Sequence, residues 1–222
     1  ATSDGTATAS SDYTAASGTL TFSAGQTSKT FNVPVLADTV YESGNETVTI
    51  TLSNATNASI SDSTGVLTIT DDDNAPTVTL TSSASSVAEN GSDLTLTATL
   101  SNATSATVTV GISTSGTGTE GTDYATVSDI TISAGATTGT SAFNPTDDSV
   151  YEGDETGIIA IDTVSGGGAT ENSTPQAVTL TISENESAPT VSLSSTATTV
   201  YDNGSDITCL LYTSPSPRDS GK

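Results

Sequence analysis

Acidic side chains are the residues of this chain with the most evident chemistry, and they occur in clusters. Asp71, Asp72 and Asp73 stand in a row in LTITDDDNAPTVTL (67–80), between two segments that have strand character. At a separation of about 4 Å, two carboxylates repel by about 4 kcal/mol at an effective dielectric constant near 20. Such crowding is tolerated where the pKa values rise or where a cation neutralises the charges. The clusters therefore indicate either shifted titration or metal binding.

Acidic residues also recur at four kinds of position in the middle of the chain. One follows a strand in VAENGS, one precedes a tyrosine after a glycine-rich loop, several lie in DDSVYEGDE, and two lie near residue 185. In a sandwich whose strands alternate in direction, loops of this kind converge at one end. The set comprises Glu89, Asp123, Asp147, Asp148, Glu152, Glu155, Glu184 and Glu186.

The chemistry of the donors favours one cation. Sites made of oxygen atoms with many carboxylates suit Ca²⁺, which takes six to eight ligands, whereas Mg²⁺ prefers fewer carboxylates and more water. Zn²⁺ is disfavoured because the chain has no His and a single Cys. We therefore expect Ca²⁺ as the bound metal. Taken one at a time, each of these acids is also compatible with an ordinary solvated loop.

The overall charge excludes several classes of function. The 222 residues include 26 acidic and 3 basic side chains, for a net charge of −23. Nucleic acids and anionic membrane surfaces are poor partners for such a chain, because phosphate contacts require clustered Lys or Arg. No apolar run approaches the roughly 20 residues that a membrane helix needs. Without His, no nucleophile–His pair can form, and we expect no enzymatic activity.

The acidic loops belong to a repeat with a period near 110 residues, as three recurring segments show. Each is given with its later copy: SDYTAASGTLTFSAG (11–25) and TDYATVSDITISAG (122–135); ADTVYESGNETVTI (37–50) and DDSVYEGDETGIIA (147–160); TDDDNAPTVTL (70–80) and SENESAPTVSL (183–193). A period of this length is that of a domain. We expect residues 1–73 to be the C-terminal part of one copy, 74–187 a complete copy, and 188–208 the start of a third.

The last stretch, CLLYTSPSPRDSGK (209–222), departs from this composition. It holds the only Cys and two of the three basic residues. CLLYTSPSPRD resembles the translation of a sequencing-library adapter, so we expect 209–222 not to be native and the chain to be a fragment, of metagenomic type, of a longer protein. The alternative is a genuine Pro/Ser-rich linker.

Period-two alternation of apolar residues predicts the fold class. It aligns Leu94, Leu96, Ala98 and Leu100 on one face, and it recurs in 107–112, 129–132 and 177–182, with Thr at the outward positions. About seven short strands in 110 residues predict an all-β chain of tandem immunoglobulin-like antiparallel β-sandwiches. The alternative, a disordered Thr/Ser-rich stalk, does not account for sustained alternation.

The segment 18–73 resembles the Calx-beta repeat, a family that includes the regulatory Ca²⁺-binding domains of sodium–calcium exchangers and tandem arrays in bacterial surface proteins. The features that match are the DY motif, the VYE loop with its following Gly and Glu, and the terminal DDD. The resemblance extends over residues 1–208. It implies a seven-stranded sandwich with Ca²⁺ sites at one tip, facing the next domain.

The resemblance also implies metal ligands. In the first copy these are Asp12, Asp38, Glu42, Asp71, Asp72 and Asp73, and in the complete copy Glu89, Asp123, Asp147, Asp148, Glu152, Glu184 and Glu186. Glu46 and Glu155 are further candidates. Ala37 stands where the second copy has Asp147, and Glu184–Asn185–Glu186 replaces the Asp triplet. The second site is therefore expected to bind more weakly or to hold fewer ions.

The expected function is that of a non-catalytic, Ca²⁺-binding structural repeat in a large secreted or cell-surface, adhesin-like protein. Its partners would be Ca²⁺ and the neighbouring repeats, across short linkers marked by Pro76 and Pro189. Two alternatives are a regulatory Ca²⁺ sensor of a membrane transporter and a module that binds glycans or another surface ligand. Tyr41 and Tyr151, which precede the loop glutamates, are expected to pack in the core, and the alternative is that they pack under the acidic site.

Overall fold

A computed structural model describes residues 1–172, 176–195, 199, 202 and 207–213. Over these residues the chain is all-β, as predicted, and none of them forms a helix long and apolar enough to cross a membrane. The strands of the described part are β1 (Thr2–Asp4), β2 (Glu46–Thr51), β3 (Thr64–Ile69), β4 (Thr77–Ser82), β5 (Ser86–Ala88), β6 (Leu94–Leu100), β7 (Val108–Gly116), β8 (Ile130–Ile132), β9 (Thr138–Phe143), β10 (Glu155–Ser165), β11 (Thr170–Glu171), β12 (Ala177–Ser183), β13 (Val191–Ser195) and β14 (Cys209–Thr213).

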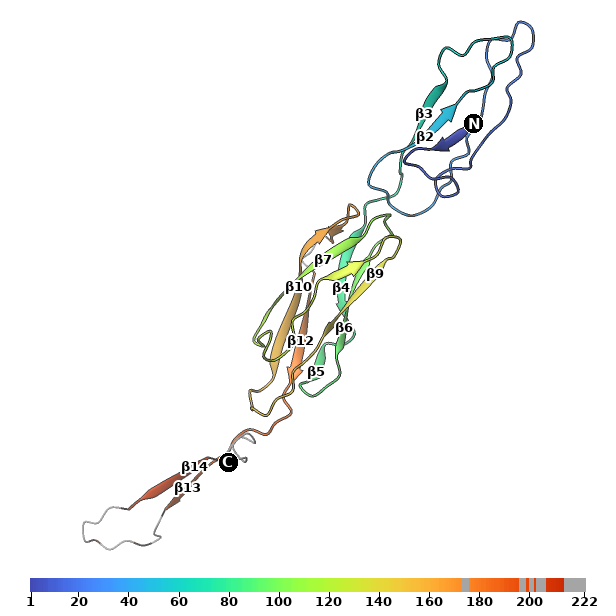
Figure 1. Ribbon diagram of the computed structural model, residues 1–222. Coiled ribbons are helices and arrows are strands. Elements are labelled where there is room, and N and C mark those ends of the chain that lie inside the picture. Colours follow the sequence, from blue (N-terminus) through green and yellow to red (C-terminus); the bar gives the residue numbers. More distant parts are fainter. Residues whose placement is uncertain (173–175, 196–198, 200–201, 203–206, 214–222) are drawn as a thin grey trace.

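The middle copy is a sandwich of two sheets (Figure 1). One sheet has the order β5-β12-β10-β7-β8 and the other the order β11-β4-β6-β9. The pairs are antiparallel except for β5 with β12 and β4 with β11, which are parallel. β4 and β5 thus divide the opening strand of the copy between the two sheets. This arrangement confirms the predicted immunoglobulin-like sandwich.

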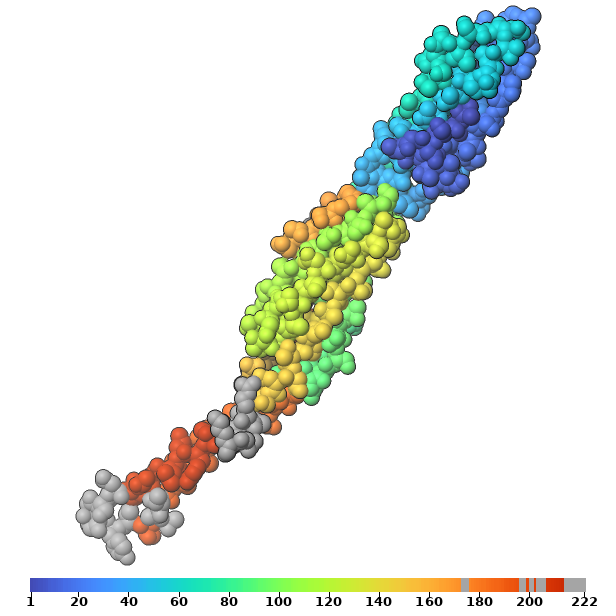
Figure 2. Space-filling model, viewed as in Figure 1, coloured from blue at the N-terminus to red at the C-terminus, as the bar shows by residue number. Residues whose placement is uncertain are grey.

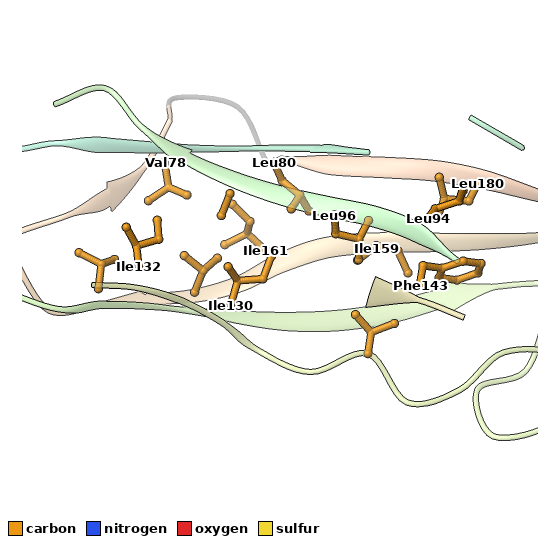
Figure 3. Close-up of a cluster of buried hydrophobic side chains, with 14 of the residues drawn as sticks. Val78, Leu80, Leu94, Leu96, Ile130, Ile132, Phe143, Ile159, Ile161 and Leu180 are labelled. Atoms are coloured by element: carbon orange, nitrogen blue, oxygen red, sulfur yellow. The ribbon is translucent and has the colours of Figure 1, made fainter. Parts of the chain in front are cut away.

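The core of the middle copy lies between these two sheets, as Figure 3 shows. β6 follows the predicted alternation: Leu94, Leu96, Ala98 and Leu100 are all buried, while the Thr residues between them are not. The same inward pattern continues on β8 and β12. Burial of these aliphatic side chains stabilises the sandwich by roughly 25 cal/mol per Å² of apolar surface removed from water.

The first copy consists of one three-stranded sheet, β1-β2-β3, and long connecting loops. Its buried cluster contains Ala7, Tyr13 and Val48, with Leu67 and Ile69 among the residues packed against it. Many of its large apolar side chains are exposed: Leu20, Phe22, Val35, Leu36, Leu52, Ile60 and Val66. The first copy therefore has a much smaller core than the second.

Strands β13 and β14 form a separate antiparallel pair that is exposed along its whole length. Val191 pairs with Thr213, as Val78 of β4 pairs with Leu100 of β6, with both partners displaced by the same 113 positions. β14 falls within the tail predicted to be non-native. Residues 196–198, 200–201 and 203–206 of the expected third copy, and 214–222 of that tail, lie outside the described residues.

The copies follow one another end to end (Figures 1 and 2). The prediction that Tyr41 and Tyr151 pack in the core is wrong. Tyr151 is 42% exposed, and Tyr41 forms a β-bridge with Thr104 of the next copy. Tyr41 lies in the loop before β2 and Tyr151 in the loop before β10, and neither belongs to the buried cluster of its copy. The tyrosines of the DY motif, Tyr13 and Tyr124, are the ones that are buried.

Candidate metal centres

Strand ends bring the acidic loops of the middle copy together. β5 and β12 run parallel and end side by side, with Ala88 paired to Ser183. Glu89 and Glu184 therefore leave the sheet as neighbours, and the Glu89 amide donates to the Ser183 carbonyl at 3.0 Å. The elements that position these two acids lie almost a hundred residues apart in the sequence.

The remaining loops join at the same end. β10 begins there, because Glu155 pairs with Ile182 near the end of β12. Strand β7 ends there as well, since Gly116 pairs with Gly157. The loop that carries Asp123 therefore starts at this end of the sandwich. The predicted convergence of four acidic segments on one end of the sandwich is thus what the topology produces.

Three groups of carboxylates result, and within each group one oxygen per residue lies within 4.8 Å of the others. Glu89 and Glu152 each belong to two groups, and Glu89 and Asp123 are buried. The groups are Glu89–Asp148–Glu152, Glu89–Glu184–Glu186 and Asp123–Glu152–Glu155. The arrangement presents several oxygens from separate loops to a common space.

The first copy repeats the arrangement around a cavity of about 300 Å³. Glu46, the first residue of β2, pairs with Ile69, so it lies beside the segment that carries the Asp triplet. All six predicted ligands of this copy line the cavity, together with Glu46. Two sets of three acids have one carboxylate oxygen per residue within 4.8 Å of the others: Asp12–Glu42–Glu46 and Asp71–Asp72–Asp73.

A set of backbone hydrogen bonds fixes the acids of both copies in the same way. The Thr8 amide donates to Asp12 Oδ2 at 2.5 Å, as the Thr119 amide donates to Asp123 Oδ2 at 2.6 Å. Each bond closes the loop before the buried tyrosine of its DY motif. The aspartate therefore has one oxygen engaged by the backbone, while its charge still faces the other acids.

The loop around the second tyrosine is held by two more bonds in each copy. The Val40 amide donates to Asp38 at 2.7 Å and the Val150 amide to Asp148 at 2.6 Å. On the other side of the tyrosine, the corresponding donors are the amides of Glu42, to Asp71 at 2.9 Å, and Glu152, to Glu184 at 2.6 Å. The repeated frame links the loop to the acidic segment after the last strand.

Burial and mutual repulsion shift the titration of the central glutamates. Burial, followed by the charges of Glu42 and Asp12, raises the pKa of Glu46 to about 7. Burial, followed by the charges of Glu184 and Glu186, raises the pKa of Glu89 to about 7. These glutamates hold their negative charge less readily than a solvated glutamate does, which is the condition that a cation relieves.

Glu184 shows the opposite behaviour. Backbone hydrogen bonds from Glu186 and Glu152, and a further one from Gly153, lower its pKa to about 2. A carboxylate that accepts several amide hydrogens stays ionised. Its charge in turn helps to raise the pKa of Glu186, mainly through a side-chain hydrogen bond between the two. Glu184 is therefore a fixed negative charge in the second site.

Two predicted ligands lie at the edge of these groups. Asp38 lines the first cavity but is not in a three-residue group, and Asp147 Oδ1 accepts a hydrogen bond from Asn185 Nδ2 at 2.8 Å. Sequence reasoning missed Asp154, whose Oδ1 accepts a hydrogen bond from the Glu184 amide at 3.0 Å. Its place in the acidic run 147–155 was the available signal.

The residues present fit a hard divalent cation. Glu46 Oε2 and Glu186 Oε2 are buried and have no hydrogen-bond donor among the residues that the structure describes. Over residues 1–208 the sequence supplies a single basic side chain, Lys29, against 25 acids. The donors are all oxygens, in numbers that match the six to eight ligands of Ca²⁺. A cation would neutralise the groups and supply the missing partner to the two buried oxygens.

The family model of the Calx-beta domain matches residues 1–73 and 71–186. Among solved structures, the crystal structure of the apo form of the Calx CBD1 domain is 21% identical, with a TM-score of 0.42, and the match covers 49% of this chain and 98% of that domain.

Two further solved structures are similar. CBD12 from CALX1.2 is 22% identical, with a TM-score of 0.41 over 48% of this chain and 44% of that one. The calcium binding domain CBD12 of CALX1.1 is 24% identical, with a TM-score of 0.40 over 45% and 41%. The match thus spans less than half of each of these two chains. No curated protein sequence matches the chain.

Proposed function

Because the chain belongs to the Calx-beta family, we propose that each copy binds Ca²⁺ at its acidic end and serves as a non-catalytic structural module. The protein would be a large, repetitive, secreted or cell-surface protein of adhesin-like character. Ca²⁺ at the end of each copy would hold the loops next to the linker in one conformation and so fix the angle between neighbouring copies.

One observation carries this proposal. The same set of acidic loops, held by the same backbone hydrogen bonds, occurs at the same end of two copies that have unequal cores. Acids that served solubility alone would have no need to converge, since dispersed charges give the same solubility at lower repulsion. Convergence in both copies favours a ligand that the acids share.

The proposed ligands are the residues that line the two sites. In the first copy they are Asp12, Asp38, Glu42, Glu46, Asp71, Asp72 and Asp73, and in the second Glu89, Asp123, Asp147, Asp148, Glu152, Glu155, Glu184 and Glu186. Bound Ca²⁺ would supply positive charge to these carboxylates. The chain itself contributes the repeated hydrogen-bond frame, which orients the acids before metal arrives.

The test is a titration of the full chain with calcium, monitored by isothermal titration calorimetry and by amide NMR spectra. We expect binding at both sites, with dissociation constants of about 10⁻⁴–10⁻³ M, the range of extracellular modules. Glu89→Gln should abolish the response of the second copy alone, and Asp12→Asn that of the first alone. Asp62→Asn and Asp162→Asn, which remove exposed charges away from the acidic ends, are the matched controls. Unchanged spectra of both copies in millimolar calcium would disprove the proposal.

The measured affinity also separates this proposal from its alternative, a regulatory sensor on a transporter. Ca²⁺ sensors bind at about 10⁻⁷–10⁻⁵ M. Calcium at 100-fold excess over the dissociation constant should stabilise a copy by about 2.7 kcal/mol, visible as a higher melting temperature than in chelator. A dissociation constant of about 10⁻⁵ M or lower would favour the sensor, whereas one of about 10⁻⁴–10⁻³ M favours the extracellular structural module.

A further inference from the structure

Tyr41 joins the first copy to the second through its backbone. Its amide donates to the Ala103 carbonyl at 2.9 Å, and its carbonyl accepts from the Ser105 amide at 3.0 Å. These two bonds add Tyr41 as a short parallel bridge beside Thr104, which is 1% exposed. The contact forms between the tip of one copy and the loop after β6 of the next.

The side chain of Tyr41 fits a site made of glycine. A Cβ on Gly168 would lie 2.5 Å from Tyr41 Cε1 and 3.0 Å from its hydroxyl, so only glycine allows the ring to occupy this position. Gly166, Gly167 and Gly168 all have positive φ, a conformation that residues with a side chain rarely adopt. We call Thr104 and Gly166–Gly168 the tyrosine socket.

The second copy presents the same tyrosine at its own far end. Tyr151 lies between the Val150 and Glu152 amides, whose hydrogen bonds to Asp148 and Glu184 match those on either side of Tyr41. Its loop therefore has the backbone frame that positions Tyr41. Tyr151 is nevertheless 42% exposed, whereas the ring of Tyr41 lies against Gly168.

The linkers that follow the two tyrosine loops have the same length. Three residues separate Asp73 from Thr77, where β4 begins, and three separate Glu186 from Thr190. Strand β13 then follows the second linker as β4 follows the first. A following copy would thus begin at the same distance from Tyr151 as the second copy does from Tyr41.

We propose that Tyr151 inserts into the tyrosine socket of a following copy of the module, as Tyr41 inserts into the socket formed by Thr104 and Gly168. The occupant of this surface is a further repeat of the same chain, presented by its first end. The contact is made by a backbone bridge and an aromatic side chain, so it does not require a metal. The proposal rests on the tandem-module role proposed above.

The experiment uses an extended chain, residues 1–189 followed by a second copy of 77–187. The added copy is expected to fold because the core of the middle copy draws on its own residues, from Val78 to Ile182. Tyrosines are replaced by 3-fluorotyrosine, the signals are assigned with Tyr41→Phe and Tyr151→Phe, and the fluorine shift between H₂O and D₂O reports exposure of each ring.

In the 222-residue chain, Tyr41 should show a small solvent shift and Tyr151 a large one. In the extended chain, the solvent shift of the Tyr151 that precedes the added copy should fall to the value of Tyr41. Gly168→Ala should raise the shift of Tyr41, and the equivalent change in the added copy should raise that of Tyr151. Gly121→Ala, at another positive φ with open space around it, is the control for backbone strain.

Spectra are recorded both in chelator and in millimolar calcium, which separates this proposal from calcium binding. Protection of Tyr151 in either condition supports the socket, even if no calcium is bound. A Tyr151 that keeps its large solvent shift in both conditions, while Tyr41 is protected, would overturn the proposal. A Tyr41 as exposed as Tyr151 in the 222-residue chain would overturn it too.

Discussion

The first copy surrounds Tyr13 and Val48 with a small cluster of apolar side chains, whereas the second fills the space between two sheets from Val78 to Ile182. Their acidic ends are nevertheless alike. In each copy a glutamate opens the strand, Glu46 on β2 and Glu155 on β10, and pairs with an isoleucine just before the last acidic segment.

This difference shows that the acidic end depends on local elements. It is assembled by two strand ends, by a loop closed by Asp12 or Asp123, and by the hydrogen bonds on either side of Tyr41 or Tyr151. The large core contributes stability, while the geometry of the acids comes from the loops. Changes in the core and in the loops should therefore have separable effects, which the following predictions test.

The largest expected effect is on core stability. Leu96 is fully buried in the second copy, and Val66 in the first is 69% exposed. Leu96→Ala should destabilise the second copy by about 2–5 kcal/mol, because it leaves a cavity, whereas Val66→Ala should change the first by less than about 0.5 kcal/mol. Urea denaturation followed by the amide signals of each copy measures both. Similar losses in the two copies would contradict the comparison.

A smaller effect is expected from exchanging one charge between the sites. Asp72 and Asn185 occupy corresponding positions. Asp72→Asn should weaken calcium binding at the first site about three- to tenfold, and Asn185→Asp should strengthen it at the second by a similar factor, because affinity follows ligand charge. Calorimetry on both variants checks this. If neither affinity moves, these positions do not contribute to the sites.

A smaller difference is expected between the stability losses on replacing the two buried tyrosines, Tyr13 and Tyr124, with Phe. The Tyr13 hydroxyl donates to Asp4 Oδ1 at 2.7 Å, while the ring of Tyr124 packs on Phe143 with centroids 4.8 Å apart. Tyr13→Phe should cost about 1 kcal/mol, the net value of one hydrogen bond, and Tyr124→Phe less than about 0.5 kcal/mol. Denaturant midpoints decide. An equal cost would show that both tyrosines act through packing alone.

The smallest effect is the pH dependence of the metal-free chain. The pKa of Glu46 and of Glu89 is raised to about 7, so the folded state binds these protons more tightly than the unfolded state does. Their contribution to stability is present below the unfolded pKa, about 4.5, and is lost as the pH rises to about 7. Glu184, with its pKa lowered to about 2, contributes above about 4.5 and loses its contribution as the pH falls toward 2.

Melting temperatures in chelator should therefore decline from about pH 5 to pH 8, by a small amount because the sites are partly open to solvent. Glu89→Gln should remove the part of this decline that belongs to the second copy. Millimolar calcium should abolish the decline, because the metal takes the place of the protons. A rise in metal-free stability over this range would contradict the assigned shifts.

The sandwich and the gathering of acids were predictable because their signals are local. Alternating Leu and Thr on β6 predicted the buried face, and the repeated loops around Asp12 and Asp123 predicted convergence. The buried face follows from the period-two alternation of apolar residues. The gathering of the acids follows from the alternating direction of the strands, which brings several loops to the same end of the sandwich.

The environment of Tyr41 was not predictable in this way. Its partners, Thr104 and Gly168, belong to another copy, and nothing within the VYE motif distinguishes a tyrosine that packs inward from one that contacts a neighbour. Three consecutive glycines at 166–168 were the available sign, since a run of positive φ values usually accommodates a close approach. Asp154 was missed because one acid among several carries no sign of which amide it accepts from.

The parallel pairing of β5 with β12 has a mechanical consequence. The chain enters the middle copy at the end opposite Glu89 and leaves it after Glu184, so tension on a string of copies would pull these adjacent strands in opposite directions along their length. Their hydrogen bonds would then be loaded together in shear, rather than opened one after another as in peeling. The split opening strand makes each such unit resistant to stretching along the axis of the string.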